Sequence, residues 1–244
     1  MHTQTSQAFD KPDHARPCQT EADPTQPRPA RPNLKEPGLL VMDVDATLIN
    51  EETIDLLGAL AGVGDDMAAI TARTMAGELD FAQSLRRRVA LLEGLDASAL
   101  DKAFHSSHFT TGAFELIDAL HRCGWKVGAV SGGFHETVDR LASAAHLDHW
   151  LANRLEAHNA TLTGKLAGSI VTKDTKADAL RIWAASDGIS LDHTVAVGDG
   201  ANDIPMLEQA ALGIAFCAKP AVRQRADACI DTRDLRLVLD LLKD

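Results

Sequence analysis

The sequence predicts an α/β fold, a doubly wound parallel sheet with an inserted helical cap. Short apolar runs typical of buried strands recur along the chain, and helix-like patterns lie between them. One long stretch, residues 51–107, departs from this alternation and shows helical periodicity only. Alternating strands and helices favour a parallel sheet that is covered on both faces, and such sheets bind ligands beyond the carboxyl ends of their strands.

Composition and charge limit the classes of function. The chain has 244 residues, 45% of them hydrophobic, which is enough for a core domain and a smaller accessory domain. A net charge of -11 argues against a nucleic-acid or anionic-membrane partner, because such surfaces need clustered Lys and Arg. The 4 cysteines form no CxxC pair, so reduced thiols are expected.

Neither a secretory signal nor a membrane span is apparent. The first residues lack a basic start followed by an apolar stretch, and no later segment offers about 18 continuous apolar residues. We therefore expect a cytoplasmic protein that contacts neither membrane nor nucleic acid. Its oligomeric state stays open.

The first segment, residues 1–36, is rich in proline and polar side chains. It cannot bury enough apolar surface to offset the entropy lost on ordering, so a disordered tail is expected. The catalytic core is expected over residues 37–50 and 108–244, with the helical cap over 51–107 inserted after the first strand. Residues 159–171, with glycines among alternating apolar positions, predict a small hairpin.

Strands and helices alternate within the predicted core. Each strand is a short apolar run, and each helix has apolar residues at a period of about 3.6. The predicted strands are GLLVMD (38–43), KVGAV (126–130), TVAVGD (194–199) and LGIAF (212–216), and the helices span 113–122, 135–145, 175–186, 203–211 and 235–242.

Four aspartates follow two of these strands. Asp43 and Asp45 end the first strand, and period-two geometry points both side chains the same way. Asp199 and Asp203 flank the glycine-rich turn VGDGAND after another strand. Any one of them can equally cap a helix or shape a turn. If the strand ends are neighbours, the carboxylates converge, and a hard divalent cation, above all Mg²⁺, relieves their repulsion.

Two further features suit a bound anion. VSGGF (130–134) follows a third strand and can present the Ser131 hydroxyl and the Gly132 N–H to a phosphate, although Ser-Gly-Gly turns are common. Lys176 lies near the start of a helix, where a cation is unfavourable beside the positive helix end. A bound phosphate explains this lysine, and a solvated surface position explains it equally well.

These residues resemble a known family. DVDATL (43–48), Ser131, Lys176 and GDGANDIPM (198–206) are similar, in order and spacing, to the motifs of the haloacid-dehalogenase superfamily of phosphatases. NEETIDLL, MAGELDFAQSLRRRVALLEGL and AFCAKP extend the similarity, over roughly residues 38–243, to the phosphoserine phosphatases of that superfamily. The resemblance implies an Mg²⁺-dependent enzyme that hydrolyses O-phospho-L-serine through an aspartyl-phosphate, the last step of serine biosynthesis.

The resemblance also implies a role for each site residue. Asp43 is the nucleophile, and Asp45 is the general acid and base. Mg²⁺ binds Asp43, the Asp45 carbonyl and Asp199, with Asp203 in support. The phosphoryl oxygens are held by Ser131, the Gly132 N–H, Lys176 and Asn202.

Substrate selectivity is expected from the cap. By resemblance, Glu52 pairs with the substrate ammonium and Arg88 binds its carboxylate. Phe81 closes the site, with Met75 nearby. From the residues alone, Arg88 also fits a solvated run of arginines, and Glu52 fits a first helical turn, where acids are favoured.

The match has departures and leaves alternatives open. Ala46 stands where the family usually has serine, and HFTTGAFEL lacks the proline that is common before its Gly-Ala. Neither departure removes a catalytic group. One alternative is a phosphatase or phosphotransferase for another small phosphorylated metabolite, and another is a catalytically dead phospho-ligand-binding protein. A dinucleotide site is excluded, because GDGAND lacks the GxGxxG spacing.

Overall fold

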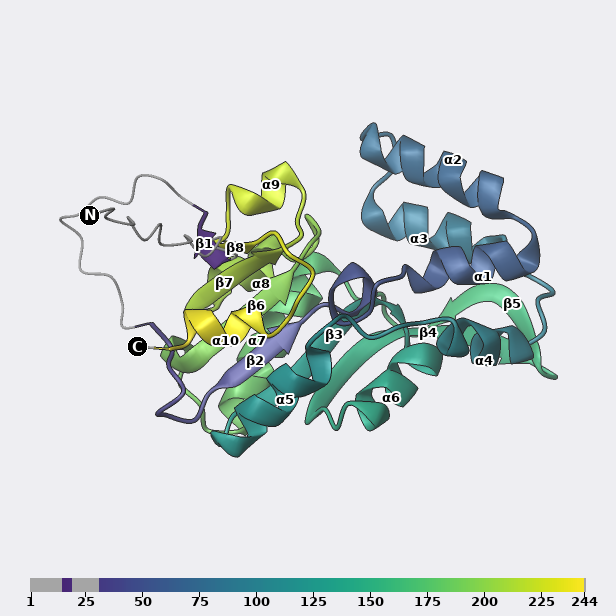
Figure 1. Ribbon diagram of the computed structural model, residues 1–244. Helices are drawn as coiled ribbons and strands as arrows, with labels where there is room; N and C mark the ends of the chain where they lie inside the picture. Colours follow the sequence, from purple (N-terminus) through teal and green to yellow (C-terminus); the bar gives the residue numbers. More distant parts are fainter. Residues whose placement is uncertain (1–14, 19–30, 244) are drawn as a thin grey trace, which may run out of the picture.

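A computed structural model describes residues 15–18 and 31–243. Within them, eight strands form one sheet in the order β1-β8-β7-β6-β2-β3-β4-β5 (Figure 1). The strands from β8 to β4 are parallel, and β1 and β5 join the two edges antiparallel, so the predicted parallel sheet is confirmed. The strands are β1 (Ala15–Pro17), β2 (Leu39–Met42), β3 (Lys126–Phe134), β4 (His149–His158), β5 (Thr161–Ala167), β6 (Thr194–Gly198), β7 (Leu212–Phe216) and β8 (Ala228–Ile230).

Helices cover both faces of this sheet (Figure 1). The central strand β2 shows the reason, because its successive side chains alternate between two hydrophobic clusters and all are fully buried. Helices α5 (Ala113–Arg122), α6 (His135–Ala144) and α10 (Leu237–Leu241) contribute to the first cluster. Helices α7 (Lys173–Ser186), α8 (Ile204–Gln209) and α9 (Pro220–Arg223) contribute to the second. The fold is therefore doubly wound.

Most predicted core elements occur with small shifts. Strands β2, β6 and β7 and helix α5 match their predicted ranges closely, and α7 begins earlier, at Lys173. Strand β3 runs on to Phe134, so the Ser-Gly-Gly segment is part of a strand and not a turn. Its pairing with β4 is irregular between Val130 and Phe134, which frees this segment from regular ladder geometry.

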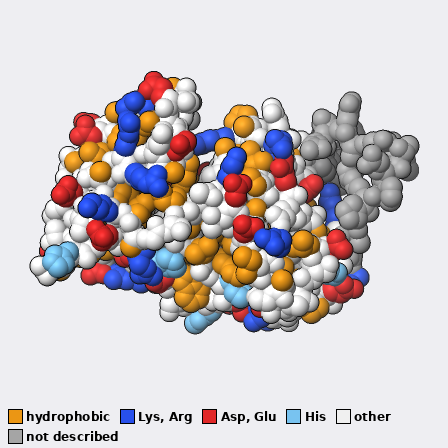
Figure 2. Space-filling model, turned by 180° about the vertical axis from the view of Figure 1, so that it is seen from behind, with side chains coloured by type: hydrophobic (Ala, Val, Ile, Leu, Met, Phe, Trp, Pro, Cys, Tyr) orange, Lys and Arg blue, Asp and Glu red, His pale blue; other side chains and the backbone are white. Residues whose placement is uncertain are grey.

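A helical insertion separates β2 from α5, where the cap is predicted (Figure 1). It contains α1 (Thr53–Ala61), α2 (Gly64–Met75), α3 (Phe81–Ala90) and α4 (Ser98–His105). Its buried side chains form a hydrophobic cluster of their own with Leu155 and Leu162 of the β4–β5 hairpin. A hairpin is therefore present where residues 159–171 predict one, but only its second strand lies within that range and its first strand, β4, precedes it. The division of the chain into core and cap at 51–107 stays a prediction. Seen from behind, the insertion and the core form two lobes with a groove between them (Figure 2).

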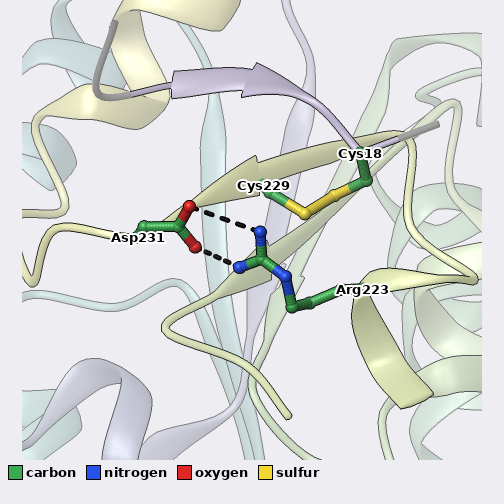
Figure 3. The surroundings of a disulfide bond; sticks show 4 residues. All are labelled: Cys18, Arg223, Cys229 and Asp231. Atoms are coloured by element: carbon green, nitrogen blue, oxygen red, sulfur yellow. Dashed lines mark hydrogen bonds and ion pairs between the residues drawn. A yellow bond between two sulfur atoms is a disulfide. The ribbon is translucent and has the colours of Figure 1, made fainter. Parts of the chain in front are cut away.

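Residues 15–18 lie against the edge strand β8. Strand β1 pairs antiparallel with β8, and Cys18 forms a disulfide with Cys229 (Figure 3). Arg223 forms an ion pair with Asp231 beside it (Figure 3). The expectation of reduced thiols is therefore wrong for this pair, whereas Cys123 and Cys217 are free. An open sheet edge offers unpaired backbone groups, which explains why this part of the predicted tail is a strand.

The predictions of a disordered tail and of no membrane span concern the whole chain, whereas the structure describes only part of it. Residues 1–14 and 19–30 of the expected disordered tail lie outside them. Within the described part of the chain, no helix is both long and apolar enough to cross a membrane. The cytoplasmic location stays a prediction.

Candidate functional site

The end of β2 places Asp43 at the centre of the sheet. Its N–H donates to the Val197 carbonyl of the neighbouring strand β6 at 3.0 Å, which extends the ladder by one residue. Its Oδ1 accepts the Val44 N–H at 2.7 Å. The residue is 5% exposed, and only a small part of it reaches solvent. Backbone contacts thus fix both the main chain of Asp43 and one oxygen of its carboxylate.

A tight turn after Asp43 brings Asp45 back toward α1, the first helix of the insertion. In this turn, η1 (Val44–Leu48), Ala46 has a φ of 54°, a left-handed conformation that costs about 1–2 kcal/mol for a residue with a Cβ. Arg233 Nη1 donates to the Ala46 carbonyl at 2.9 Å and helps to hold the turn. As a result, Asp45 Oδ1 accepts hydrogen bonds from Thr53, the first residue of α1.

Lys176 is a buried cation between two carboxylates. Thr172 caps α7 by accepting the Thr175 N–H, and this cap directs the first turn of the helix. The Lys176 Nζ lies 2.8 Å from Asp43 Oδ1 and donates to Asp203 Oδ1 at 2.7 Å. Burial opposes its charge, but Asp203 and Asp43 outweigh burial and raise its pKa. With 1% of its surface exposed, Lys176 is not a solvated surface residue.

Glycines let the turn after β6 fold tightly. A Cβ on Gly198 would lie 2.6 Å from the Cβ of Asp203, and a Cβ on Gly200 would lie 2.3 Å from Asn202 Oδ1. Any larger residue at either position would displace these side chains. The Gly200 N–H also donates to Asp203 Oδ2 at 3.0 Å, so Asp203 is fully buried with both oxygens occupied.

Asp43, Asp199 and Asp203 form a cluster that fits a hard cation. One carboxylate oxygen from each lies within 4.8 Å of the others. Burial and then the Asp203 charge raise the pKa of Asp199 to about 6 and hold the pKa of Asp43 well above its ordinary value. The single ammonium of Lys176 does not balance these carboxylates. Oxygen donors with surplus negative charge suit Mg²⁺, and Asp43 and Asp199 retain free lone pairs for it.

The end of β3 supplies a third side of the site. Ser131 is fully buried, and its Oγ accepts the Gly133 N–H at 2.8 Å. A Cβ on Gly132 would lie 3.0 Å from Phe81 Cζ, so this glycine leaves room for an aromatic ring from α3. Asn153 Nδ2 donates to the Gly132 carbonyl at 2.8 Å and holds the segment from behind.

Helices α1 and α3 form the opposite wall. Glu52 precedes α1, and Arg88 lies on α3 with its Nε buried and without a hydrogen-bond partner among the described residues. Arg86 and Arg87 are exposed, so Arg88 does not share their solvated position. Loss of hydration in the cavity, and then the charges of Asp45 and Asp199, raise the pKa of Glu52 to about 7.

One cavity joins the two walls. Three predicted residues, Ser131, Lys176 and Asp203, lie behind its surface, and Met75 ends α2 with its side chain outside the described part of the structure. The predicted residues that line the cavity are Asp43, Asp45, Glu52, Phe81, Arg88, Gly132, Asp199 and Asn202. The lining also includes Ile54, Leu85, Gly133, Gly200 and Lys219.

Lys219 is the charged lining residue that the sequence analysis missed. It follows β7 as Asp199 follows β6, so the rule that ligand sites lie beyond strand ends could have found it in AFCAKP. Its charge partly offsets the effect of burial on the pKa of Asp199. No comparable signal marks Ile54 and Leu85, because their spacing is that of ordinary core positions.

Comparison with known proteins adds a family and close relatives. A family model of haloacid dehalogenase-like hydrolases matches residues 40–208. The phosphoserine phosphatase of Streptococcus thermophilus is 56% identical over 207 residues, which cover 85% of this chain and 96% of that protein. The phosphoserine phosphatase of Lactococcus lactis is 55% identical over 205 residues, which cover 84% of this chain and 95% of that protein.

Solved structures share the fold. Two of them superpose with a TM-score of 0.81 at 44% sequence identity, and each comparison covers 86% of this chain and 100% of the other. One is described as a substrate-bound phosphoserine phosphatase complex. The other is described as a phospho-aspartyl intermediate analogue of phosphoserine phosphatase.

Proposed function

The chain belongs to the phosphoserine phosphatase family of haloacid dehalogenase-like hydrolases, and from that membership we propose that it hydrolyses O-phospho-L-serine to L-serine and phosphate. One observation carries the proposal: a single cavity places the carboxylates of the core opposite Glu52 and Arg88. A small substrate with a phosphate at one end and an amino-acid group at the other matches this arrangement. The substrate-bound and phospho-aspartyl relatives support the same reaction.

Asp43 is the proposed nucleophile. Both of its contacts, to the Val44 N–H and to Lys176, fall on Oδ1, so Oδ2 keeps its lone pairs for attack on phosphorus. As the bond from Oδ2 to phosphorus forms, the bond from phosphorus to the seryl oxygen breaks, and its electron pair leaves with that oxygen. Lys176 limits the build-up of negative charge beside Asp43.

Asp45 is the proposed acid and base. Burial raises its pKa, which favours the protonated carboxyl that can donate to the departing seryl oxygen. In the second half-reaction a water attacks phosphorus, returns a proton to Asp45, and releases phosphate from Asp43. The same carboxyl therefore serves both steps with opposite proton transfers.

The remaining core residues are proposed to hold the phosphoryl group and the metal. Asp43, Asp199 and the Asp45 carbonyl would hold Mg²⁺, with Asp203 behind them. When bound, Mg²⁺ withdraws charge from the phosphoryl oxygens. The same oxygens are proposed to contact Ser131, the Gly132 N–H, Lys176 and Asn202.

The helical insertion, residues 51–107, is the proposed cap that selects the substrate. Glu52 would pair with the ammonium, and Arg88 would bind the carboxylate through two parallel hydrogen bonds. The unpartnered Nε of Arg88 supports this role, because a buried donor without a partner is costly until a ligand occupies it. Phe81 covers Gly132 and would exclude water, with Met75 nearby.

A hydrolysis panel tests the proposal. The panel contains L-phosphoserine, L-phosphothreonine, phosphoethanolamine, which lacks the carboxylate, 3-phosphoglycerate, which has a hydroxyl in place of the ammonium, and a sugar phosphate. We expect phosphate release from L-phosphoserine that requires Mg²⁺, stops on chelation, and exceeds the other rates by a factor of roughly 10² or more in kcat/KM. Equal turnover across the panel would refute the substrate, and unchanged turnover after chelation would refute the metal.

A further inference from the structure

Thr53 makes two hydrogen bonds to one oxygen of Asp45. Its Oγ1 donates to Asp45 Oδ1 at 2.6 Å, and its N–H donates to the same oxygen at 3.1 Å. Thr53 is 1% exposed, so water does not compete for this contact. Among the described residues, these are the hydrogen bonds that the Asp45 carboxyl accepts. One residue at the start of α1, through its side chain and its backbone N–H, therefore controls how this carboxyl is turned.

The second oxygen of Asp45 has a different environment. A Cβ on Gly133 would lie 2.7 Å from Asp45 Oδ2 and 3.0 Å from Ser131 Oγ. Oδ2 thus lies against the end of β3, in space that only glycine leaves open. Both Asp45 and Gly133 line the catalytic cavity. The two oxygens are therefore distinct, since one is occupied by the cap helix and the other lies on the side of the phosphate-binding segment.

We propose that Thr53 is a positioning residue that fixes Asp45 so that Oδ2 is the oxygen that exchanges protons with the substrate. A carboxyl group otherwise rotates broadly about its last torsion. Two donors on Oδ1 hold that torsion, and an oxygen that already accepts two hydrogen bonds is poorly placed to carry a proton as well. The inference rests on the proposed role of Asp45 as acid and base.

The proposed proton path explains what Thr53 contributes. As the bond between phosphorus and the leaving oxygen breaks, the proton on Oδ2 moves to that oxygen, and the later attack of water returns a proton to Oδ2. A seryl alkoxide is strongly basic and needs this proton as it leaves. A nitrophenolate is weakly basic and leaves without one. Loss of the Thr53 hydroxyl should therefore harm alkyl phosphates far more than aryl phosphates.

The experiment compares two leaving groups. For wild type and Thr53→Val, kcat/KM with Mg²⁺ is measured on 4-nitrophenyl phosphate and on L-phosphoserine, or on whichever alkyl phosphate of the panel the wild type hydrolyses best. This parameter reports the steps up to loss of the leaving group. We expect a fall of roughly tenfold on the alkyl phosphate and less than roughly twofold on the aryl phosphate. Thr53→Ser, which keeps the hydroxyl, should restore most of the loss.

A matched control separates positioning from stability. Thr194 is also fully buried, and its hydroxyl donates to the Leu191 carbonyl at 2.6 Å at the start of β6, the end of the strand opposite the site. Thr194→Val should lower the melting temperature without changing the ratio of the two rates. Equal losses on both substrates for Thr53→Val, or no loss on either, would overturn the inference. A wild-type protein that hydrolyses other phosphates but not L-phosphoserine would instead refute the proposed function and leave the inference on Thr53 testable.

Discussion

The two walls of the cavity differ in how their charged groups are paired. The core wall is formed by the strand ends that carry Asp43 and Asp199, and the cap wall by α1 and α3 with Glu52 and Arg88. On the core wall, Lys176 contacts both Asp43 and Asp203, and Asp203 also accepts a backbone N–H. On the cap wall, the side chains of Glu52 and Arg88 have no hydrogen-bond or ion-pair partner within the described residues, and Arg88 Nε is also buried. The charged groups of the core wall are thus paired without substrate, and by the proposed roles of Glu52 and Arg88 the substrate would complete the cap wall. Variants of the two walls should fail in different kinetic parameters.

The largest effect is expected from Asp43, the proposed nucleophile of the core wall. Asp43→Asn keeps the size of the side chain and removes its charge, so kcat on L-phosphoserine should fall by a factor of roughly 10⁴ or more. Steady-state kinetics measure the loss, and circular dichroism shows whether the fold is retained. An active D43N protein whose side chain mass spectrometry finds unmodified would contradict the mechanism.

The next effect tests whether the core wall depends on its buried cation. Lys176→Met leaves Asp43 and Asp203 buried without their partner, which should cost about 3–5 kcal/mol of unfolding free energy in metal-free buffer. The loss should shrink at low pH, because protonation removes the repulsion between the carboxylates. Urea unfolding at two pH values measures both quantities.

A surface ion pair of the same length serves as the control for Lys176. Lys126 Nζ lies 2.7 Å from Asp148 Oδ1, but the Lys126 side chain is 47% exposed. Lys126→Met should cost about 0–1 kcal/mol, because water screens exposed pairs. Similar losses of unfolding free energy in the two variants would mean that burial does not increase the contribution of a lysine ion pair to stability.

The cap wall should affect KM more than kcat. Arg88→Ala should raise KM for L-phosphoserine by roughly 30- to 100-fold, the value of a charge-assisted contact, and change kcat little. Phosphoethanolamine has no carboxylate, so its kinetics should be almost unchanged. Arg87→Ala, at an exposed position beside it, is the matched control. An equal rise in KM for both substrates would show that Arg88 does not read the carboxylate.

The smallest effect concerns the pH dependence of Glu52. Its pKa is raised from 4.5 to about 7, so it gains a proton as the pH falls from 8 to 6 and can no longer pair with an ammonium. KM for L-phosphoserine should therefore rise severalfold over that range. Glu52→Gln should have a high KM throughout, and its remaining pH dependence reports the substrate phosphate, with its second pKa of about 6, together with Asp199, whose pKa is also about 6.

The raised pKa also sets the sign of a stability effect. The folded protein disfavours ionised Glu52, so this group reduces stability progressively as the pH rises from 4.5 through about 7. In the absence of substrate, Glu52→Gln should therefore melt above the wild type at pH 8 and close to it at pH 4. A lower melting temperature than the wild type at pH 8 would mean that Glu52 makes a stabilising contact instead.

The core could be predicted from sequence because its residues follow strands with clear apolar patterns. Asp43, Asp45, Asp199 and Asp203 all lie at ends of β2 and β6, and neighbouring parallel strands bring them together. Strand β8 was missed because three residues are too short for a pattern, and β4 because its sequence mixes polar and apolar residues without a clear period. Local patterns are reliable only where an element is long or uniformly buried.

The cap wall depends on contacts that no local pattern contains. Glu52 and Arg88 were identified by resemblance, since in the sequence they look like an ordinary helix start and a surface arginine. Thr53 carries no signal at all, because its partner Asp45 is reached only through the left-handed turn at Ala46. The partner of Cys18 is likewise set by strand pairing and not by cysteine spacing.

The disulfide between Cys18 and Cys229 turns most of the protein into a covalent ring. The two cysteines are 211 residues apart, so β2 to β7 and both walls of the cavity lie inside one closed loop. By loop-closure entropy, a ring of this length destabilises the unfolded chain by about 5 kcal/mol. During synthesis Cys18 emerges before every other strand of the sheet, and Cys229 emerges after β7. The first strand to be made is therefore the last that can be locked in place.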